Sequence, residues 1–173
     1  AYQHFGLDDF ADIVSVGKTS QVCATLFSGA YRPPPGLIRQ TFTGSTSAIA
    51  AACYVVEEFG RGHLFGESGR VAEVSRRFTE GFDAIARRHP DWLHGPHGLG
   101  AMLAFTPFEG EKQSTRRVLD ELFEQGVIAF STAGVLSRVR FLPPVAVIQN
   151  EQIDTVLEIL EACLAVVATE RGA

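Results

Sequence analysis

Apolar and polar positions predict three elements in the first third of the chain. Two short apolar runs, at about 12–16 and 22–27, predict strands that are buried in a sheet. Residues 33–36, three prolines and a glycine, predict an exposed turn between them and the next element. Residues 48–59 are rich in strong helix formers and are followed by Gly60, which predicts a helix with a glycine C-cap.

The pattern beyond residue 60 predicts alternating helices and strands. A long amphipathic helix is expected from about 64 to 88, with Pro90 as its stop. A loop rich in glycine and proline follows, containing Trp92, His94 and His97. The remaining expected elements are strands at 99–105, 127–130 and 135–141, a helix at 114–125, and a final helix capped by Asn150. Their order predicts an α+β unit in which helices pack on a small antiparallel sheet.

Several expected apolar stripes define the core of this second region. They comprise Val71, Val74, Phe78, Phe82 and Ile85; Val118, Leu119, Leu122 and Phe123; and Ile153, Val156, Leu160, Leu164 and Val167. The alternation in 135–141 places Val135, Val139 and Phe141 on one face, and Arg138 and Arg140 on the other. We therefore divide the chain into residues 1–59 and a small domain at 60–173. Two buried strands in the first part would need sheet partners outside the chain. Their backbone N–H and C=O groups would otherwise lack hydrogen-bond partners.

Composition and charge exclude several classes of protein. The 46% apolar and 20% charged content is ordinary for a globular protein, and the net charge of −5 argues against a nucleic-acid partner. No apolar run approaches the roughly 20 residues that a membrane helix needs. Cys23, Cys53 and Cys163 are odd in number, widely spaced and set among apolar residues. We expect buried, reduced thiols, and hence a cytoplasmic setting.

Lys18 is the most unusual charged residue in the sequence. It follows Gly17 at the end of the first apolar run, and only Lys112 accompanies it in a chain with thirteen arginines. A lysine between two apolar strands can be a catalytic amine, because burial lowers its pKa and lysine condenses with carbonyl compounds. The alternative is a lysine whose stem lies along an apolar strand end while its amine reaches solvent.

Two further features complete a possible site. Residues 40–47 supply hydroxyl groups just before the helix at 48–59, either as ordinary caps at Ser45 or Thr46 or as an anion site at the helix start. Arg140 lies on a strand before Pro143 and could bind a carboxylate through two parallel hydrogen bonds. An amine, a phosphate site and a carboxylate site together suit pyridoxal phosphate chemistry on amino acids. His94 and His97 have no third ligand nearby, so we predict no metal site.

These motifs give the sequence a family resemblance. The segment from Asp12 to Lys18, residues 40–44 and the segment from Val139 to Pro144 resemble motifs of the class III, or ω-amino-acid, aminotransferases. The resemblance implies the α/β fold of fold-type I pyridoxal phosphate enzymes. It places residues 1–59 at the end of the large cofactor domain and 60–173 in the small C-terminal domain. It makes Lys18 the Schiff-base lysine, Thr41 a phosphate ligand across a homodimer, and Arg140 the ligand of the substrate carboxylate.

The resemblance also implies an activity, with alternatives. The family moves an amino group from an ω-amine or amino acid to a keto acid such as 2-oxoglutarate, using pyridoxal 5'-phosphate. Gln21 to Cys23 most resembles the lysine 6-aminotransferase branch, whereas Thr43 and Ser45 depart from the family pattern. An aminomutase, racemase or decarboxylase of the same fold, or a non-catalytic dimerisation fragment, remains open. Since the other cofactor-binding elements of the family lie upstream of its lysine, we expect this chain alone to be inactive and to need the N-terminal portion of the same enzyme.

Overall fold

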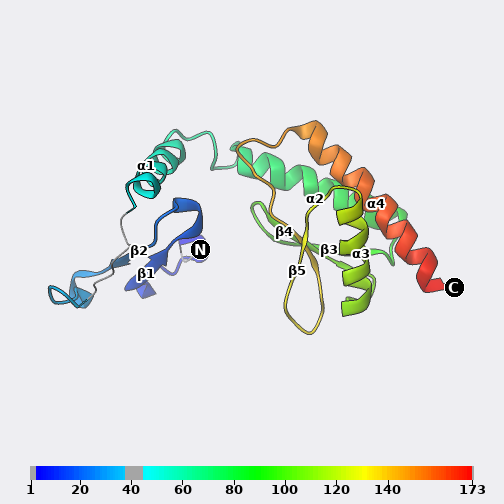
Figure 1. The fold of residues 1–173 in the computed structure, drawn as a ribbon, viewed down its shortest axis with the longest axis horizontal. Coiled ribbons are helices and arrows are strands. Elements are labelled where there is room, and N and C mark those ends of the chain that lie inside the picture. Colours follow the sequence, from blue (N-terminus) through cyan, green and yellow to red (C-terminus); the bar gives the residue numbers. More distant parts are fainter. Residues whose placement is uncertain (1–2, 38–44, 173) are drawn as a thin grey trace. The chain divides into compact units, whose positions relative to one another are not determined.

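The chain forms two compact units, Ala1–Gly62 and His63–Ala173 (unit 1 and unit 2). The computed structural model describes residues 3–37 and 45–172. Figure 1 shows the elements of both units, which are described separately below. The predicted assignment of 1–59 and 60–173 to two domains of a larger enzyme stays a prediction.

Unit 1 is built from a hairpin and a helix. Strands β1 (Ile13–Val16) and β2 (Ala24–Phe27) pair in antiparallel register, with Ile13 opposite Phe27, which confirms the two predicted strands. Four short 3-10 helices accompany them in the described part of the unit: η1 (Gln3–Phe5), η2 (Asp8–Phe10), η3 (Lys18–Ser20) and η4 (Gly29–Tyr31). Helix α1 (Thr46–Gly60) completes the unit. The strands were expected to be buried, but Ile13 is 56% exposed, because β1 and β2 pair only with each other among the described residues.

Unit 2 contains a four-stranded antiparallel sheet. Its strands are β3 (Leu93–Leu99), β4 (Met102–Pro107), β5 (Phe130–Ser131) and β6 (Val139–Phe141), in the spatial order β3-β4-β6-β5. Across the centre of the sheet, Phe105 lies opposite Val139 and Ala104 lies opposite Arg140. The structure thus confirms the predicted small antiparallel sheet.

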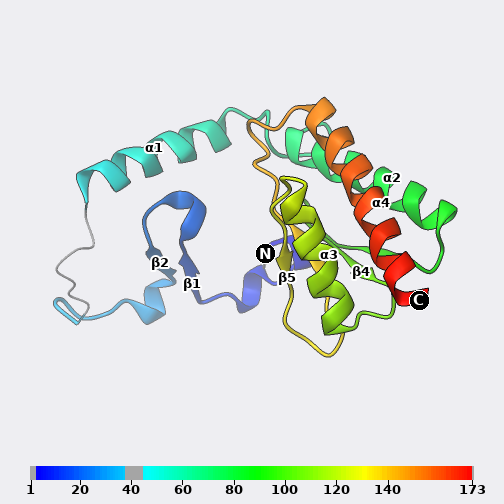
Figure 2. The same cartoon turned by 45° about the vertical axis from the view of Figure 1, so that its right-hand side comes forward.

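Three helices cover the sheet: α2 (Arg70–Arg88), α3 (Lys112–Glu124) and α4 (Asn150–Gly172). Helices α2 and α3 contact the strands, and α4 packs against both of these helices. Figures 1 and 2 show α2 and α4 side by side. One apolar cluster joins the helices to the sheet, with four aromatic rings at its centre: Phe78, Phe82, Phe105 and Phe141. The predicted α+β unit is correct.

The predicted stripe residues of unit 2 are buried or half-buried, except for two that are exposed. Phe123 is 67% exposed and Val135 is 99% exposed, so both inward assignments were wrong. Phe123 lies in the last turn of α3, just before Gly126, which adopts the left-handed conformation (φ +82°) of a helix-ending glycine. Val135 precedes β6 in a bend, where the alternation of a strand no longer applies.

The segment after α2 forms a strand where the sequence predicted a loop. Residues 93–99 form the edge strand β3, and their register shifts between His94 and His97. An edge strand with an irregular register tolerates a glycine and a proline in its interior. Helix α2 also begins later than predicted, at Arg70 rather than 64, because Gly66 has a φ of +90°.

Two predictions about side chains near helix ends and about cysteines also need correction. Asn150 does not cap α4: its amide nitrogen donates to Glu73 and its oxygen accepts from Arg70, while Gln152 accepts from the backbone nitrogen of Gln149.

All three cysteines are free, and Cys163 is buried as expected. Cys23 and Cys53 are exposed, because unit 1 encloses little apolar volume.

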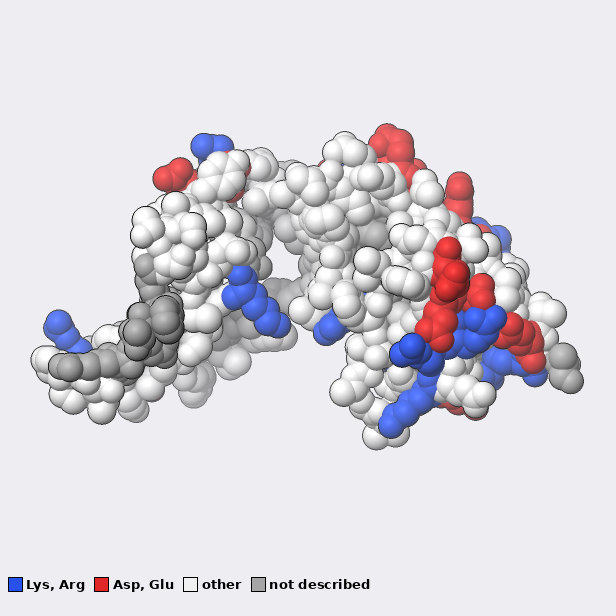
Figure 3. Space-filling model, viewed as in Figure 1, with Lys and Arg blue, Asp and Glu red and all other residues white. Residues whose placement is uncertain are grey.

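Charged side chains of unit 2 gather where α3 meets the end of α4, as Figure 3 shows. Arg117 pairs with Glu170 at 2.8 Å, and Arg171 pairs with Glu111 at 2.5 Å. These pairs are solvent-exposed, so each contributes little to the stability of the fold. None of the helices in the described ranges is long and apolar enough to cross a membrane.

Candidate active site

Lys18 lies in the connection between the two strands of unit 1. The backbone leaves β1 at Gly17 in an extended conformation and turns through η3, where the nitrogen of Gln21 donates to the carbonyl oxygen of Lys18 at 2.9 Å. Ser20 fixes the return of the chain by donating from its hydroxyl to the carbonyl of Val22 at 2.7 Å. A Cβ atom at Gly17 would lie 3.1 Å from the Cys23 sulfur, so a glycine suits this close approach. Helix α1 lies against the same turn.

The backbone of this turn is strained at the lysine itself. Lys18 has a φ of +62° and Gln21 a φ of +60°, and Phe108 is the third non-glycine residue with positive φ in the described ranges. This conformation costs roughly 1–2 kcal/mol for a residue with a Cβ atom. Such strain concentrates at functional sites, where a side chain must leave the backbone in one direction. Lys18 is exposed, so its amine is accessible from outside unit 1.

The hydroxyl-rich segment is only partly described. Thr41 lies outside the described residues. Ser45 occupies the N-cap position of α1, but its side chain makes no capping bond and its Oγ lies 2.9 Å from the Oγ of Ser47. Ser45 therefore does not form the hydrogen bond that an ordinary N-cap residue makes.

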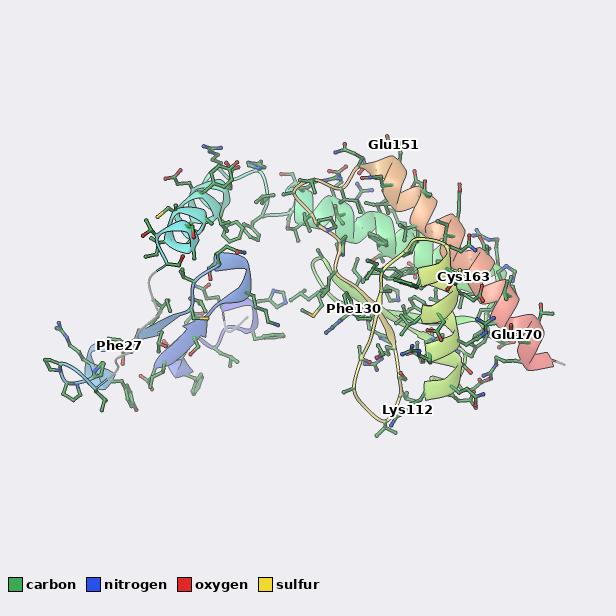
Figure 4. All side chains as sticks on the ribbon, viewed as in Figure 1. Phe27, Lys112, Phe130, Glu151, Cys163 and Glu170 are labelled. Carbon is green, nitrogen blue, oxygen red and sulfur yellow. The ribbon has the colours of Figure 1, made fainter. Side chains whose placement is uncertain are left out.

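Arg140 lies in the centre of β6 on the face of the sheet opposite the aromatic core. It lies opposite Ala104 on β4 and opposite Phe130 on β5. Figure 4 labels Phe130. The guanidinium carbon lies 5.9 Å from the centre of the Phe130 ring, a cation–π contact. The Nε atom of Arg140 is buried and has no hydrogen-bond partner in the described structure. A buried guanidinium donor without an acceptor is costly and therefore suggests a ligand that accepts the bond.

Arg138 lies two residues earlier and points to the same side of the sheet, as the alternation predicted. Its Nε donates to the hydroxyl of Thr106 at 3.4 Å, and its backbone nitrogen donates to the Thr132 hydroxyl at 3.2 Å. The Nε2 atom of His97 lies 3.2 Å from the same Thr106 hydroxyl oxygen. Burial, followed by the positive charge of Arg138 and then by His94, lowers the pKa of His97. We call His97, Thr106, Phe130, Arg138 and Arg140 the arginine face.

The sequence interpretation missed two members of the arginine face. Thr106 and Phe130 were not singled out, and His97 was assigned to a loop. The detectable signal was the alternation within 102–107, which puts Ala104 and Thr106 on the side opposite Leu103 and Phe105. The pairing that brings Thr106 to Arg138 could not be read from the sequence, because register depends on which strands meet. Among the described residues, no cluster of three His, Cys, Asp or Glu side chains could hold a metal ion.

Three comparisons place these residues among known proteins. A family model described as "Aminotransferase class-III" matches residues 1–164. The L-lysine-epsilon aminotransferase of Streptomyces clavuligerus is 28% identical over 97% of this chain and 36% of its own length. The 5-aminovalerate aminotransferase of Pseudomonas putida is 31% identical over 78% of this chain and 32% of its own length. The chain thus spans about a third of the length of these curated relatives.

Solved structures share the arrangement of the elements. The lysine aminotransferase from M. tuberculosis, in the form titled internal aldimine, matches with a TM-score of 0.78 and 25% identity, over 95% of this chain and 38% of that one. An ornithine aminotransferase from Toxoplasma gondii matches with a TM-score of 0.76 over 98% of this chain and 40% of its own, at 18% identity, which shows a common fold alone.

Proposed function

Because this chain belongs to the class III aminotransferases, we propose that it supplies the catalytic lysine and a substrate-binding arginine of an enzyme that transfers amino groups. The amino group would pass from an ω-amine or amino acid to a keto acid such as 2-oxoglutarate. The likeness to solved aminotransferases confirms the predicted fold-type I class. The family uses pyridoxal 5'-phosphate. The observation that carries the proposal is Lys18, a lone lysine held in a left-handed turn at the end of a strand.

The described residues of unit 1 suit this cofactor. Pyridoxal phosphate supplies an aldehyde that condenses with amines and a ring that accepts electrons from the carbon next to the nitrogen. Lys18 offers the required primary amine, exposed and directed by a constrained backbone. Ser45 and Ser47 offer hydroxyls at the start of α1, whose free N–H groups suit a phosphate. We assign Thr41 as a further phosphate ligand, which would act across the interface of a homodimer.

Lys18 would work as the acid and base of the reaction. The Lys18 amine would take a proton from the carbon of the substrate next to the nitrogen and return it to a second carbon. Such a role needs a fixed direction of approach rather than a flexible side chain. The bond from Gln21 to the carbonyl of Lys18 fixes the turn from which the side chain extends.

Arg140 would bind the carboxylate of the substrate. Its buried Nε has no acceptor among the described residues, and a carboxylate can accept from Nε and a terminal nitrogen together. The Phe130 ring on one side restricts the guanidinium plane, which leaves less rotational freedom to lose on binding.

We further propose a setting for this activity. The chain would act as part of a longer polypeptide that supplies the rest of the cofactor site, in a cytoplasmic homodimer. The relatives named as lysine-epsilon and 5-aminovalerate aminotransferases support an ω-amino acid as donor. The likeness over Gln21 to Cys23 favours the lysine 6-aminotransferase branch.

The test replaces Lys18 in the full-length enzyme. Lys18→Ala should lower the rate of glutamate formation from 2-oxoglutarate by about 10²–10⁴-fold, the contribution of a positioned acid and base. It should also abolish the cofactor label that borohydride fixes on the peptide containing residue 18. Lys112→Ala, in unit 2, is the matched control and should leave both readouts unchanged. A borohydride label that persists in Lys18→Ala would refute the assignment, and a labelled enzyme that forms no glutamate would favour a racemase, aminomutase or decarboxylase.

A further inference from the structure

Two of the cavities in unit 2 border different faces of α3, and both are lined by Arg116. The first lies between α3 and the end of α4, and its lining includes three carboxylates, those of Glu111, Asp120 and Glu170. The second lies between α3 and the segment that connects β5 to β6, and has a volume of about 350 Å³. Among the described residues no carboxylate lines this second cavity, which we call the loop cavity. Figure 4 labels Lys112, at the end of α3 that borders it.

The helix wall of the loop cavity carries two positive side chains. Lys112 and Arg116 are four residues apart, so they are neighbours on the surface of α3. Lys112 has no ion pair among the described residues, whereas the two glutamates that precede it in the sequence both pair with Arg171. The Nε of Arg116 lies 2.9 Å from a carboxylate oxygen of Asp120, and its two terminal nitrogens have no acceptor in the described structure. Both side chains can therefore donate hydrogen bonds to an anion.

The loop wall of the cavity contains Ser137, whose hydroxyl has no partner among the described residues. Ser137 is 5% exposed, and its backbone is fully bonded: the nitrogen donates to Gly110 at 2.8 Å, and the carbonyl accepts from the Thr115 hydroxyl at 3.3 Å. In the described ranges, the Nε of Arg140 is the one fully enclosed side-chain polar atom without a partner, so the Ser137 hydroxyl retains some surface. The loop cavity, which Ser137 lines, provides that surface. A hydroxyl this deep without a partner suggests a ligand that accepts its hydrogen bond.

Two further hydroxyls line the same wall. The Thr132 hydroxyl accepts from the backbone nitrogen of Arg138 at 3.2 Å, which leaves its own hydrogen available to a second group. Ser131 is exposed and also borders the cavity. The lining thus combines two cations with three hydroxyl donors and offers no carboxylate to any of them. A phosphate group suits such a set of donors, because it carries up to two negative charges and three strong acceptor oxygens.

We propose that the loop cavity binds a phosphate group, either as inorganic phosphate or as the phosphate ester of a small metabolite. Lys112 and the terminal nitrogens of Arg116 bind its charge, and the hydroxyls of Ser131, Thr132 and Ser137 donate to its oxygens. Its volume of about 350 Å³ lies in the range of small-molecule sites. The loop cavity is distinct from the phosphate ligands proposed for the cofactor, which belong to unit 1. A bound phosphate connects the loop to α3 and so stabilises unit 2.

The first experiment measures the affinity of inorganic phosphate for the full-length enzyme with its cofactor bound. Calorimetry is done at a constant ionic strength, which sodium chloride maintains. Lys112→Gln and Arg116→Gln should each weaken binding by about 5- to 20-fold, because each removes a charge-assisted hydrogen bond at an exposed rim. Ser137→Ala should weaken binding by about 2- to 10-fold, the effect of one neutral hydrogen bond. Arg87→Gln, which removes an exposed arginine of α2, is the matched control and should leave the affinity unchanged.

The second experiment locates the bound phosphate by hydrogen exchange. Phosphate should slow the exchange of amides in residues 131–137 of the wild type, and this protection should be absent in Lys112→Gln at the same phosphate concentration. Protection confined to unit 1 would place the phosphate at the cofactor site and refute the proposal. Arg140→Gln should leave the phosphate affinity unchanged. A loss of binding in that variant would mean that phosphate occupies the proposed carboxylate site, which would also refute the loop cavity as its site.

Glycerol 3-phosphate separates the two sources of the phosphate group. Binding that is tighter than that of inorganic phosphate, and weakened by Lys112→Gln, assigns the site to a phosphate ester; weaker binding assigns it to free phosphate. The proposal is overturned if phosphate gives no more heat than chloride, or if Lys112→Gln and Arg116→Gln bind it as the wild type does. Both residues are exposed, so these two variants should melt at the wild-type temperature in phosphate-free buffer, which shows that their fold is intact.

Discussion

Unit 1 and unit 2 differ sharply in how far they bury their apolar side chains. Among the described residues of unit 1, Ala52 is the one buried apolar side chain, whereas Phe10 is 80% exposed. In unit 2, helices and sheet enclose a cluster in which Phe82, Phe105 and Val139 have no exposed surface. Burial of apolar area is the main stabilising contribution to a fold. Unit 2 therefore has the means to hold itself together, and unit 1 depends on further contacts.

The comparison bears on the proposed chemistry. Lys18, the proposed catalytic amine, lies in the unit with little core, on a strained turn. Arg140, the proposed substrate-binding residue, lies on the face of the sheet opposite the packed apolar cluster. On the proposed function, a longer chain would cover the exposed apolar residues of unit 1 and so complete the cofactor site around Lys18. Removing single side chains from each unit tests this contrast.

The largest expected effect is the loss of an aromatic ring from the core of unit 2. Phe82 contacts the rings of Phe78, Phe105 and Phe141, so Phe82→Ala should lower the free energy of unfolding by about 3–5 kcal/mol. Urea unfolding of the 1–173 polypeptide, followed by Trp92 fluorescence, measures this in unit 2 alone, because Trp92 is the single tryptophan. Phe10→Ala in unit 1 should change stability by less than about 0.5 kcal/mol. An equal cost at both positions would show that unit 1 has a core after all.

A smaller effect is expected from adding a methyl group to a helix of each unit. A Cβ atom at Gly81 of α2 would come within 2.3 Å of the side chain of Leu157 on α4, so Gly81→Ala should destabilise unit 2 by about 1–3 kcal/mol. Gly60 ends α1 with open space around it, so Gly60→Ala should stabilise that helix by up to about 1 kcal/mol. Circular dichroism during thermal unfolding compares the two variants. A neutral Gly81→Ala would mean that α2 and α4 can separate at little cost.

The smallest effect is a dependence of unit 2 on pH through His97. Its pKa is lowered in the fold, so below the ordinary value of about 6.5 the unfolded chain takes up a proton that the folded chain resists. The free energy of unfolding should therefore fall as the pH decreases from 6.5 and should not change through this group above it. His97→Gln should flatten this slope. NMR titration should also show the pKa of His97 rising toward its usual value in Arg138→Gln; an unchanged value would mean that the charge of Arg138 does not lower it.

Local pattern predicted most of the elements and misplaced particular boundaries. The strands of the hairpin, the α+β order and most of the apolar stripes followed from periodicity, because each side of a helix or strand has its own environment. The loop predicted at 92–97 is an edge strand instead, since pairing with β4 stabilises residues whose glycine and proline disfavour a strand. Asn150 looked like a helix cap, yet its amide bonds to Arg70 and Glu73, distant in the sequence.

By itself the sequence indicated the family to which this chain belongs and the residues to which a chemical role can be proposed. A lysine after a glycine, and an arginine before two prolines, are local features, because a residue type at a given position needs no fold to be recognised. Only the tertiary structure decided how these residues are held. The left-handed backbone at Lys18, the burial of the Nε atom of Arg140 and the bond from Arg138 to Thr106 depend on which segments meet across a turn or a sheet. Many registers are compatible with the same local pattern.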